Sequence, residues 1–434
     1  MIKKINIEIL RLSIPNIISN ISVPLLSTVD TILMGGLSNV HLAAVGIGSM
    51  IFNIIYWNFG FLRMGTTGIT AQFFGAKDND NIWLSFLRAS ILALVLAILL
   101  LITQSLLYYG SVWALNIGQD INPLVAEYYS IRIWAAPASL LLMVVMGWFF
   151  GMQNAIFPLI LTVVINLVNI ILSYYLVKYQ GMEVRGVALG TTIAQYVGLI
   201  VGLILFGIRY SHLISYRILH RLKKWLAFVR FMKVNIDLFL RTVCLTFAFG
   251  FFYSQSSKLG NTVLAVNVVL MQFVNWMSYG IDGFAFASES LVGKYKGAKD
   301  DDALKIVIRQ SFIWGGMVSV LYALVYFIWG PQLFQIFSSD ASLKEVSGEL
   351  LFYMAIFPLV SFASYIWDGI FVGLTATTSM RNAMLFALIL FVGVYFILPV
   401  TENGSNIWQA MCLFMLLRAV FQYAYYNKYG LQMK

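Results

Sequence analysis

Charged residues are scarce in this 434-residue chain, since Asp, Glu, Lys and Arg make up 11 % of it against about 25 % in a typical soluble domain. Hydrophobic residues make up 60 %. A soluble protein of this size needs a polar surface, so the composition excludes a soluble enzyme, a disordered chain and a nucleic-acid-binding domain. Apolar runs such as 91–101 are unbroken. The strands of a β-barrel wall would instead alternate apolar and polar residues with a period of two. The chain is therefore predicted to be an all-α polytopic membrane protein.

The residues that enzymes use for catalysis are also few. There are three histidines without metal-ligand spacing, and no glycine-rich phosphate loop ends in Lys-Ser or Lys-Thr. Cys244 and Cys412 lie in apolar stretches, which gives no support for a disulfide scaffold. We predict no enzymatic activity, no cofactor, no metal site and no nucleic-acid partner. The opening Met-Ile-Lys-Lys is interpreted as the start of an uncleaved first helix.

Twelve apolar segments are each long enough to cross a bilayer, which takes about 20 residues of α-helix. The expected spans are 9–34, 42–74, 82–109, 123–150, 156–178, 186–209, 228–257, 263–295, 303–330, 345–373, 382–400 and 405–427. An even number of spans places both termini on the same side of the membrane.

The net charge of +10 comes from basic residues that gather in alternate loops. Lys3 and Lys4 precede the first segment, and seven Lys and Arg lie within 209–233. The loops of the other set carry few cations, so the positive-inside rule predicts cytoplasmic termini. Apolar residues and cations are mixed in the 210–230 connection, which fits an amphipathic segment on the membrane face and a solvated linker equally well.

An internal repeat divides the chain into two halves. One gapless alignment of the chain with itself places Gly-Ala-Lys-Asp at 75–78 on the same tetrapeptide at 297–300, and the Gly-x-x-x-Gly of 147–151 on that of 369–373. We call this alignment the repeat register. Since six spans per half is an even number, both halves enter the membrane in the same orientation, as parallel repeats. The expected domains are an N-terminal lobe (1–209), a basic cytoplasmic linker (210–227) and a C-terminal lobe (228–434).

Asp30 is the clearest candidate for function. A charged side chain at the bilayer centre costs roughly 2.5–3.5 kcal/mol on insertion scales, so it is read as functional by default. Helical spacing places Asp30 near one polar face with Asn16 and Asn20, and Pro24 can interrupt the backbone bonds of the same segment. We predict that Asp30 takes part in ion coupling. The alternative is a hydrated aspartate at the outer interface.

The second half holds further ionisable residues within apolar segments. Asp237 and Arg241 are four residues apart, and we expect them to form a structural ion pair within one helix. Asp282, Glu289 and Asp368 are expected to titrate or to contact a cation.

Several motifs resemble those of multidrug and toxic compound extrusion (MATE) transporters. Asp-Thr-x-x-Met-Gly-Gly-Leu at 30–37, followed by His-Leu-Ala-Ala-Val-Gly at 41–46, resembles the signature of the first two helices of that family. Asn-x-Asp-x-x-x-Arg-Thr at 235–242, the acidic segment 279–293 and Asp-Gly-Ile-Phe-x-Gly at 368–373 resemble its DinF-like branch. The resemblance implies a V-shaped pair of six-helix lobes around a central cavity.

The resemblance also implies a coupling site in the N-terminal lobe. In the DinF-like branch the first-helix aspartate, here Asp30, is the proton site, and the matching neighbours are Asn169, Ser173 and Thr191. The family pattern Asn-Ile-x-Leu-Asp ends here in Ser173, so a second carboxylate is missing. A sodium ion needs several oxygen ligands, so we expect protons rather than sodium. In sodium-coupled branches the tenth-helix aspartate takes part, here Asp368.

The predicted function is secondary antiport of amphipathic, cationic small molecules across the bacterial inner membrane in exchange for protons. The expected partners are these substrates, protons and membrane lipid, and the expected state is a monomer. Two alternatives stay open at this point. One is a sodium-coupled exporter, and the other is a flippase of lipid-linked precursors in the same superfamily.

Overall fold

The fold is almost entirely helical. The computed structural model describes the backbone of residues 1–35, 37–223, 225–337 and 340–430, together with their side chains except those of 23–31, 217, 223, 225–227 and 341–342. Helix accounts for 90 % of the structure, and the described residues contain no strand. In chain order the helices are α1 (Ile2–Gly35), α2 (Asn39–Asn58), α3 (Phe61–Gly75), α4 (Asn79–Ile102), α5 (Gln104–Leu115), α6 (Asn122–Arg132), η1 (Ile133–Ala135), α7 (Ala136–Gly151), α8 (Ile156–Lys178), α9 (Glu183–Tyr210), η2 (Ser211–Leu213), η3 (Tyr216–Lys223), α10 (Trp225–Lys258), α11 (Asn261–Gly297), α12 (Asp301–Phe337), α13 (Ala341–Gly373), α14 (Thr377–Ile397) and α15 (Ser405–Tyr429).

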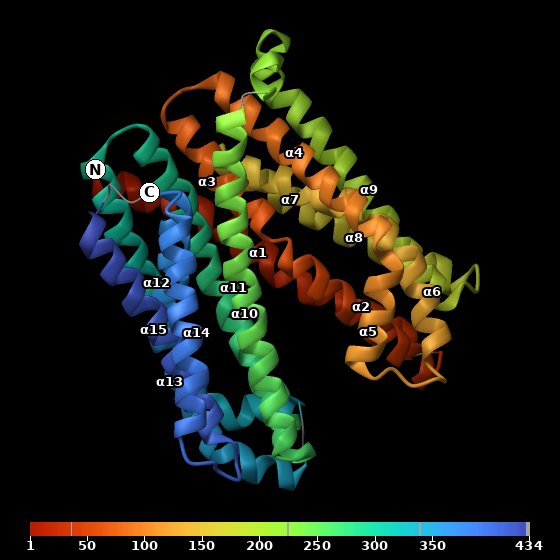
Figure 1. Ribbon diagram of the computed structural model, residues 1–434. Helices are drawn as coiled ribbons and strands as arrows, with labels where there is room; N and C mark the ends of the chain where they lie inside the picture. Colours follow the sequence, from red (N-terminus) through yellow and green to blue (C-terminus); the bar gives the residue numbers. More distant parts are fainter. Residues whose placement is uncertain (36, 224, 338–339, 431–434) are drawn as a thin grey trace. The chain divides into compact units, whose positions relative to one another are not determined.

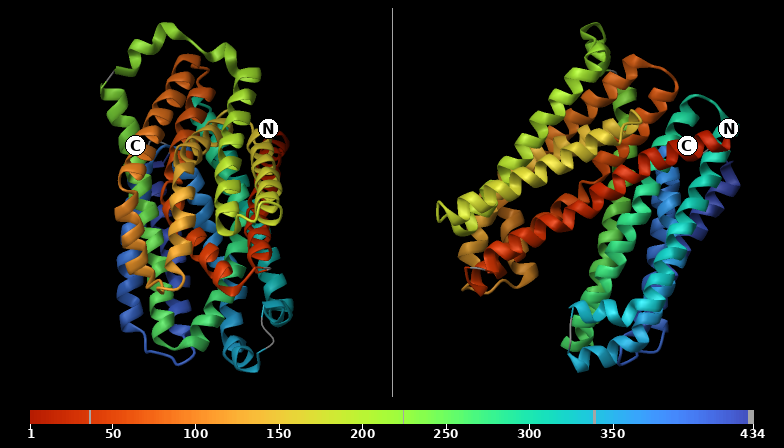
Figure 2. Two further views of the ribbon diagram at one scale, coloured as in Figure 1. Left: turned by 90° about the vertical axis from the view of Figure 1, so that its right-hand side faces the viewer. Right: turned by 180° about the vertical axis from the view of Figure 1, so that it is seen from behind.

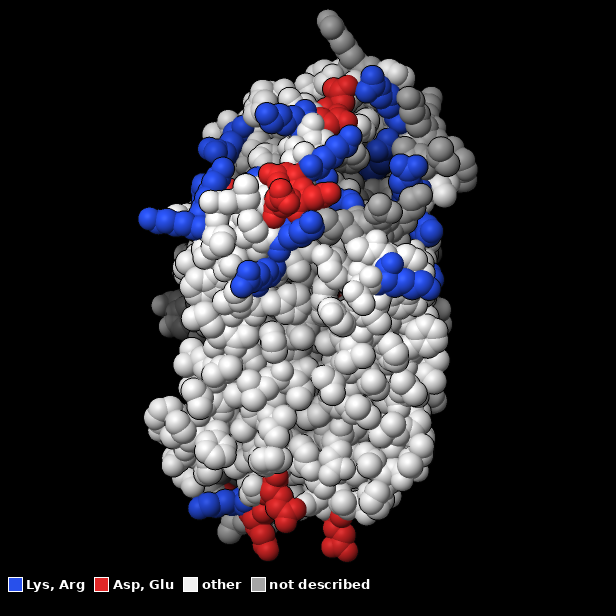
Figure 3. Space-filling view, turned by 90° about the vertical axis from the view of Figure 1, so that its left-hand side faces the viewer, with Lys and Arg blue, Asp and Glu red and all other residues white. Residues whose placement is uncertain are grey.

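The helices have the length and composition of membrane spans. Within the described residues, eleven helical segments are long and apolar enough to cross a bilayer, and the 34-residue α1 covers the first of the twelve expected spans. Figure 3 shows one face of the molecule, on which a broad band without Lys, Arg, Asp or Glu separates two charged ends. The expected all-α polytopic architecture is confirmed.

Some element boundaries differ from the expected ones. The predicted span 82–109 is divided at Thr103, whose hydroxyl donates to the carbonyl of Leu99 at 2.8 Å and thereby competes with the backbone of the helix. The predicted span 303–330 continues to Phe337, because α12 runs past Pro331.

The basic linker packs against α4. Leu213 and Ile218 are buried, and the guanidinium of Arg221 lies 2.9 Å from the carboxylate of Asp80. The backbone carbonyl of Arg221 accepts a hydrogen bond from Arg88. The described part of the linker is therefore anchored to the N-terminal half of the chain, whereas the sequence pattern allowed a solvated segment.

The chain forms two compact units. The N-terminal unit comprises Ile18–Met232, and the C-terminal unit comprises Lys233–Lys434 together with Met1–Ile17. Helix α1 belongs to both, and it is the continuous red helix in the right-hand view of Figure 2 (Figure 1 gives its label). The observed N-terminal unit thus differs from the lobe expected at 1–209 at both ends, because it lacks Met1–Ile17 and includes residues 210–232.

The first half of α1 is held within the C-terminal unit by side-chain contacts with α11 and α12. The carboxylate of Glu8 accepts hydrogen bonds from the ammonium of Lys294 at 2.8 Å and from the hydroxyl of Tyr295 at 2.9 Å. The indole of Trp314 donates to Asn6 at 3.2 Å. A Cβ on Gly283 would lie 2.4 Å from Ile17, so only glycine permits this close approach of α11 to α1.

Each half contains the same glycine-mediated helix contact. In the N-terminal unit, a Cβ on Gly147 of α7 would lie 2.4 Å from the carbonyl oxygen of Arg63 in α3. In the C-terminal unit, a Cβ on Gly369 of α13 would lie 2.2 Å from the carbonyl oxygen of Ala285 in α11. The repeat register places both partners of the first contact on those of the second, so the sequence repeat has a direct structural counterpart.

The turns after the second span of each half also match. Lys77 and Lys299 both adopt a left-handed backbone conformation, with φ of 55° and 57°. The following amide of Asp78 donates to Phe73 at 3.0 Å, and that of Asp300 donates to Tyr295 at 3.1 Å. Helix packing and turn geometry therefore follow one plan in both halves, as two parallel repeats require.

Candidate ion-coupling sites in the two halves

A polar stripe runs along α8 in the N-terminal unit. Its members are four, three and four residues apart, a spacing that places them on one face of a helix. They are Thr162, Asn166, Asn169 and Ser173. All are buried except Asn166, which is partly exposed. The stripe therefore faces protein rather than lipid over at least three helical turns.

Asn169 and Ser173 form the buried centre of this stripe. Both side chains are fully buried, and the hydroxyl of Ser173 donates to the amide oxygen of Asn169 over 3.4 Å, which is a weak contact. The amide nitrogen Nδ2 of Asn169 has no hydrogen-bond partner within the described structure. A buried amide donor without a partner is costly, so it marks a place where an acceptor is expected.

Helix α9 reaches this centre through a glycine. A Cβ on Gly190 would lie 2.6 Å from the hydroxyl oxygen of Ser173 and 2.8 Å from its backbone nitrogen. The next residue, Thr191, is also buried, and its hydroxyl donates to the carbonyl of Val187 at 2.8 Å. The structure thus brings Asn169, Ser173 and the backbone beside Thr191 together.

The second part of α1 lies along α8. The hydroxyls of Ser19 and Thr162 are 2.7 Å apart, and the amide of Asn166 donates to the carbonyl of Ser22 at 3.0 Å. Asp30 belongs to α1, but its side chain lies outside the described residues, as does that of Pro24.

The polar centre of the C-terminal unit is Asp368 on α13. Its carboxylate pairs with Arg241 of α10 and with Arg418 of α15, and the Arg418 contact measures 2.6 Å. Gln422 of α15 donates to the other carboxylate oxygen at 2.6 Å. All four side chains are buried. Two guanidinium groups compensate the charge of Asp368, so an incoming cation would have to displace an arginine.

The expected ion pair between Asp237 and Arg241 is a wrong prediction. Arg241 pairs with Asp368, while Asp237 pairs with Arg381 at 2.5 Å and accepts hydrogen bonds from Thr378 at 2.7 Å and Thr377 at 3.2 Å. The physical reason is that an intrahelical pair is worth only about 0.2–0.5 kcal/mol. The first turn of α14 offers Asp237 hydroxyl donors and a positive helix end.

Asp282 and Glu289 lie on α11, seven residues apart. Asp282 is partly buried and interacts electrostatically with the hydroxyl of Tyr365, as do Asp368, Arg241 and Arg418. Glu289 is buried two turns further along, where its backbone carbonyl meets Gly373. Asp282 thus shares Tyr365 as an interaction partner with the Asp368 cluster.

Sequence reasoning missed most of the partners in the C-terminal unit. Arg418, Gln422, Arg381 and Tyr365 were not predicted as members of a site, although the four-residue spacing of Arg418 and Gln422 on one helix is a usable signal. No group of three or more His, Cys, Asp or Glu suited to a metal ion occurs in the part of the chain that the structure describes.

The fold and these buried polar centres define a class: a helical membrane protein built from two parallel repeats. The sequence profile of the MatE family matches residues 15–175 and 238–397, one copy in each half. The chain belongs to the MatE family. The expected family membership is confirmed.

Among its relatives is the DNA damage-inducible protein F of Escherichia coli (strain K12), which is 34 % identical over 412 residues and aligns with 94 % of this chain and 89 % of that protein. The multidrug resistance protein NorM of Photobacterium profundum is 25 % identical over 368 residues, 81 % of this chain and 78 % of its own length. The relation to DNA damage-inducible protein F confirms the expected DinF-like branch.

Solved structures share the fold. A MATE crystal structure in the bent conformation superposes with a TM-score of 0.87 at 19 % identity, covering 97 % of this chain and 94 % of that one. An outward-facing multidrug resistance MATE transporter gives the same TM-score at 20 % identity, covering 97 % and 95 %. At these identities the likeness shows the architecture alone.

Proposed function

We propose that this protein is a secondary active exporter that moves amphipathic, cationic small molecules across the bacterial inner membrane in exchange for protons. Similarity to the multidrug resistance protein NorM supports export of small molecules. The observation that carries the coupling mechanism is the buried centre of α8, where the amide nitrogen of Asn169 lacks an acceptor.

The register of α1 on α8 supports Asp30 as the missing acceptor. The two described contacts between these helices join residues 143 and 144 positions apart in the sequence. Asp30 and Ser173 are also 143 positions apart. Both contacts advance in the same direction along the two helices, and we propose that this register continues for two more turns and brings position 30 to Ser173. A carboxylate there accepts from Asn169, whereas a protonated acid can donate instead.

A proton suits this site better than a sodium ion. Sodium needs several oxygen ligands, and the site offers one amide oxygen, one serine hydroxyl and a threonine hydroxyl already bonded to its own helix. One proton neutralises one carboxylate completely and needs no further ligand. Protonation of Asp30 therefore changes both the charge and the hydrogen bonding of the α1–α8 contact in one step.

The Asp368 cluster is assigned a structural role in this scheme. Its carboxylate already has two guanidinium partners and one amide donor, so ion binding there costs the loss of existing pairs. We therefore assign coupling to the N-terminal unit. Asp282 and Glu289 remain secondary candidates.

The proposed topology has both termini and the basic linker in the cytoplasm, in a monomer. Cysteine at position 221 or 428 should resist an impermeant thiol reagent applied to intact cells and react in everted vesicles. Labelling from outside in intact cells would overturn the orientation without bearing on the coupling residue.

The test of function is transport into everted vesicles or proteoliposomes that contain the full chain. Uptake of a fluorescent organic cation is measured under an imposed pH gradient and then under an imposed sodium gradient. We expect the pH gradient to drive uptake and Asp30→Asn, which preserves size but cannot titrate, to abolish it. Asp120→Asn, a matched change at an exposed position, should transport normally. Wild-type rates from Asp30→Asn under the pH gradient would exclude Asp30 as the coupling residue, and sodium-driven uptake alone would exclude protons.

A further inference from the structure

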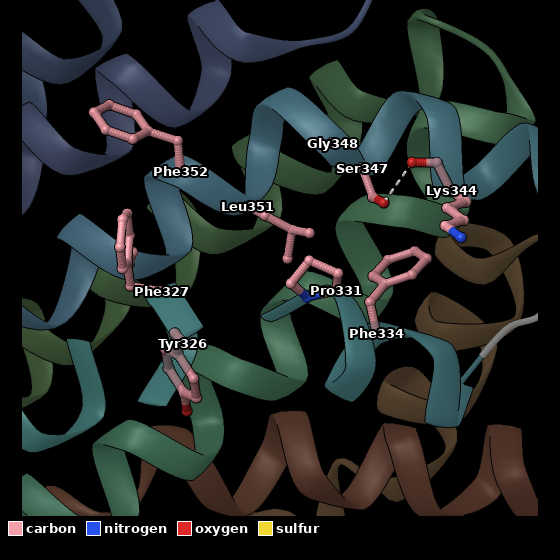
Figure 4. A pocket seen from close by; sticks show the side chains of 10 residues that line it. Tyr326, Phe327, Pro331, Phe334, Lys344, Ser347, Gly348, Leu351 and Phe352 are labelled. Atoms are coloured by element: carbon pink, nitrogen blue, oxygen red, sulfur yellow. Dashed lines mark hydrogen bonds between the residues drawn. The ribbon is translucent and has the colours of Figure 1, made fainter. Parts of the chain in front are cut away.

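The C-terminal unit holds an apolar cavity of about 400 Å³ between α12 and α13. Figure 4 shows side chains from both helices around it, with Pro331 and Leu351 facing each other and Lys344 at one end. The other principal walls are Phe327, Phe334 and Phe352. The size is in the range of ligand sites, which usually measure about 300–1,000 Å³.

The repeat register relates this region to the N-terminal unit. Helices α4 and α5 together span 79–115, and the repeat register places them on α12, 301–337, end to end. In that register Gly330 of the C-terminal unit aligns with Tyr108 of the N-terminal unit. Leu351 aligns with Tyr129.

The two tyrosines fill the equivalent space in their own unit. The rings of Tyr108 and Tyr129 are 5.1 Å apart, and each hydroxyl is hydrogen-bonded, to Asn122 at 2.6 Å and to the carbonyl of Gln104 at 2.9 Å. In the C-terminal unit a Cβ on Gly330 would make ordinary contact with Leu351 at 3.4 Å. Leu351 lines the cavity, so a smaller pair of residues stands beside it where the first repeat has two packed aromatic rings.

The chemistry of the cavity indicates an apolar chain as its occupant. Its walls are aromatic and aliphatic, so they offer few partners for ordered water, which needs two to four. Phe327 and Phe352 at its rim are 72 % and 59 % exposed, on segments that are membrane spans by length and composition. Lipid hydrocarbon is the solvent of such a surface.

A charged residue beside the cavity indicates the head group. Lys344 is the single charged residue in its described lining, and the neighbouring Glu345 is exposed on the same helix. A zwitterionic phospholipid can place its phosphate at Lys344 and its ammonium near Glu345. We propose that this cavity is a binding site for one acyl chain of phosphatidylethanolamine, with its phosphate held by Lys344.

Photo-crosslinking tests the site. The purified full chain is reconstituted in vesicles that contain phosphatidylethanolamine with a diazirine on one acyl chain, and the adducts are mapped by peptide mass spectrometry. We expect adducts to concentrate in 326–334 and 347–355. The variant Gly330→Tyr/Leu351→Tyr rebuilds the ring pair of the first repeat and should lose most of them.

A milder variant and a control keep the test decisive. Leu351→Phe should lower the adduct yield in both segments even if the double variant folds poorly. Leu321→Tyr adds the same ring at a lipid-exposed position of α12 and should leave the yield unchanged. Adducts spread evenly over all exposed helices, or unchanged in Leu351→Phe, would overturn the site.

A separate labelling experiment tests the head-group assignment. Lys344→Gln should lower labelling by the phosphatidylethanolamine probe and leave labelling by a diazirine diacylglycerol, which lacks a phosphate, unchanged. Equal labelling of both proteins by the phospholipid would overturn the role of Lys344. Stronger labelling by a phosphatidylglycerol probe than by phosphatidylethanolamine would overturn the zwitterionic assignment.

Discussion

The two halves of the molecule share a helical plan and differ in what they bury at its centre. In the N-terminal unit, Asn169 and Ser173 form a neutral centre with one amide donor left open. In the C-terminal unit, Asp368 is engaged by two arginines and a glutamine. The repeat register places Asn169 on Phe391 and Asp368 on Met146, so neither centre has a counterpart in the other half. A duplicated scaffold thus holds a neutral centre with an open amide donor in one half and a centre whose charges are already paired in the other.

The largest effect on stability is expected from a substitution in the Asp368 cluster. Arg418→Met removes one of the two guanidinium partners of a buried carboxylate and should lower the free energy of unfolding by about 3–5 kcal/mol. The measurement is unfolding in mixed SDS micelles, together with the amount of protein in the membrane. Unchanged stability would mean that the charges of Asp368 are not satisfied by this pair, and the contrast between the halves would disappear.

The next largest effect on stability tests whether both halves depend on the same glycine-mediated helix contact. Gly147→Ala and Gly369→Ala each force a methyl group against a backbone carbonyl of the neighbouring helix, and each should cost about 1–3 kcal/mol. Gly207→Ala and Gly393→Ala are matched controls, one in each half, because a Cβ there meets no atom within 4 Å. Loss of stability in only one of the two test variants would break the equivalence of the repeats.

A smaller effect concerns the partner of Asp237. A double-mutant cycle between Asp237 and Arg381 should give a coupling energy of about 0.5–3 kcal/mol, whereas the cycle between Asp237 and Arg241 should give a value near zero. Both cycles use the same unfolding measurement. A strong coupling between Asp237 and Arg241 would restore the intrahelical pair that the sequence spacing indicated.

The smallest effect on stability is expected in the neutral centre, together with a large effect on transport. Asn169→Leu replaces an amide whose donor is open by an apolar group of similar size, so stability should change by less than about 1 kcal/mol. Under a pH gradient, export should fall strongly. A variant that loses stability and transport together would indicate a merely structural role for Asn169.

The positions of the helices could be predicted because apolar runs of about 20 residues are needed to cross a bilayer. The repeat could be predicted because motifs such as Gly369 to Gly373 mark places where two backbones touch, and these places tolerate no side chain. Asn169 and Ser173 were predicted from the family resemblance, because they stand at matching positions of its motif.

The partners of the buried charges could not be predicted in the same way. Asp237 meets Thr377, Thr378 and Arg381, which lie 140, 141 and 144 residues away, and spacing within one helix says nothing about them. The cavity between α12 and α13 has a sequence signal, since Gly330 and Leu351 align with two tyrosines of the first repeat. That signal becomes visible only when the contact of Tyr108 with Tyr129 is known.

Helix α1 also bears on how the chain can be divided. Residues 1–17 belong to the C-terminal unit, where Ile17 lies over Gly283 and Glu8 binds Lys294 and Tyr295. A gene split at the linker would therefore produce two fragments that are not the two structural units. The second fragment would lack its N-terminal segment and expose the surface of α11 around Gly283 that Ile17 covers. Complementation between separately made halves thus depends on the first helix reaching from one polypeptide to the other, and a circular permutant that opens the chain near residue 17 would separate the units more cleanly.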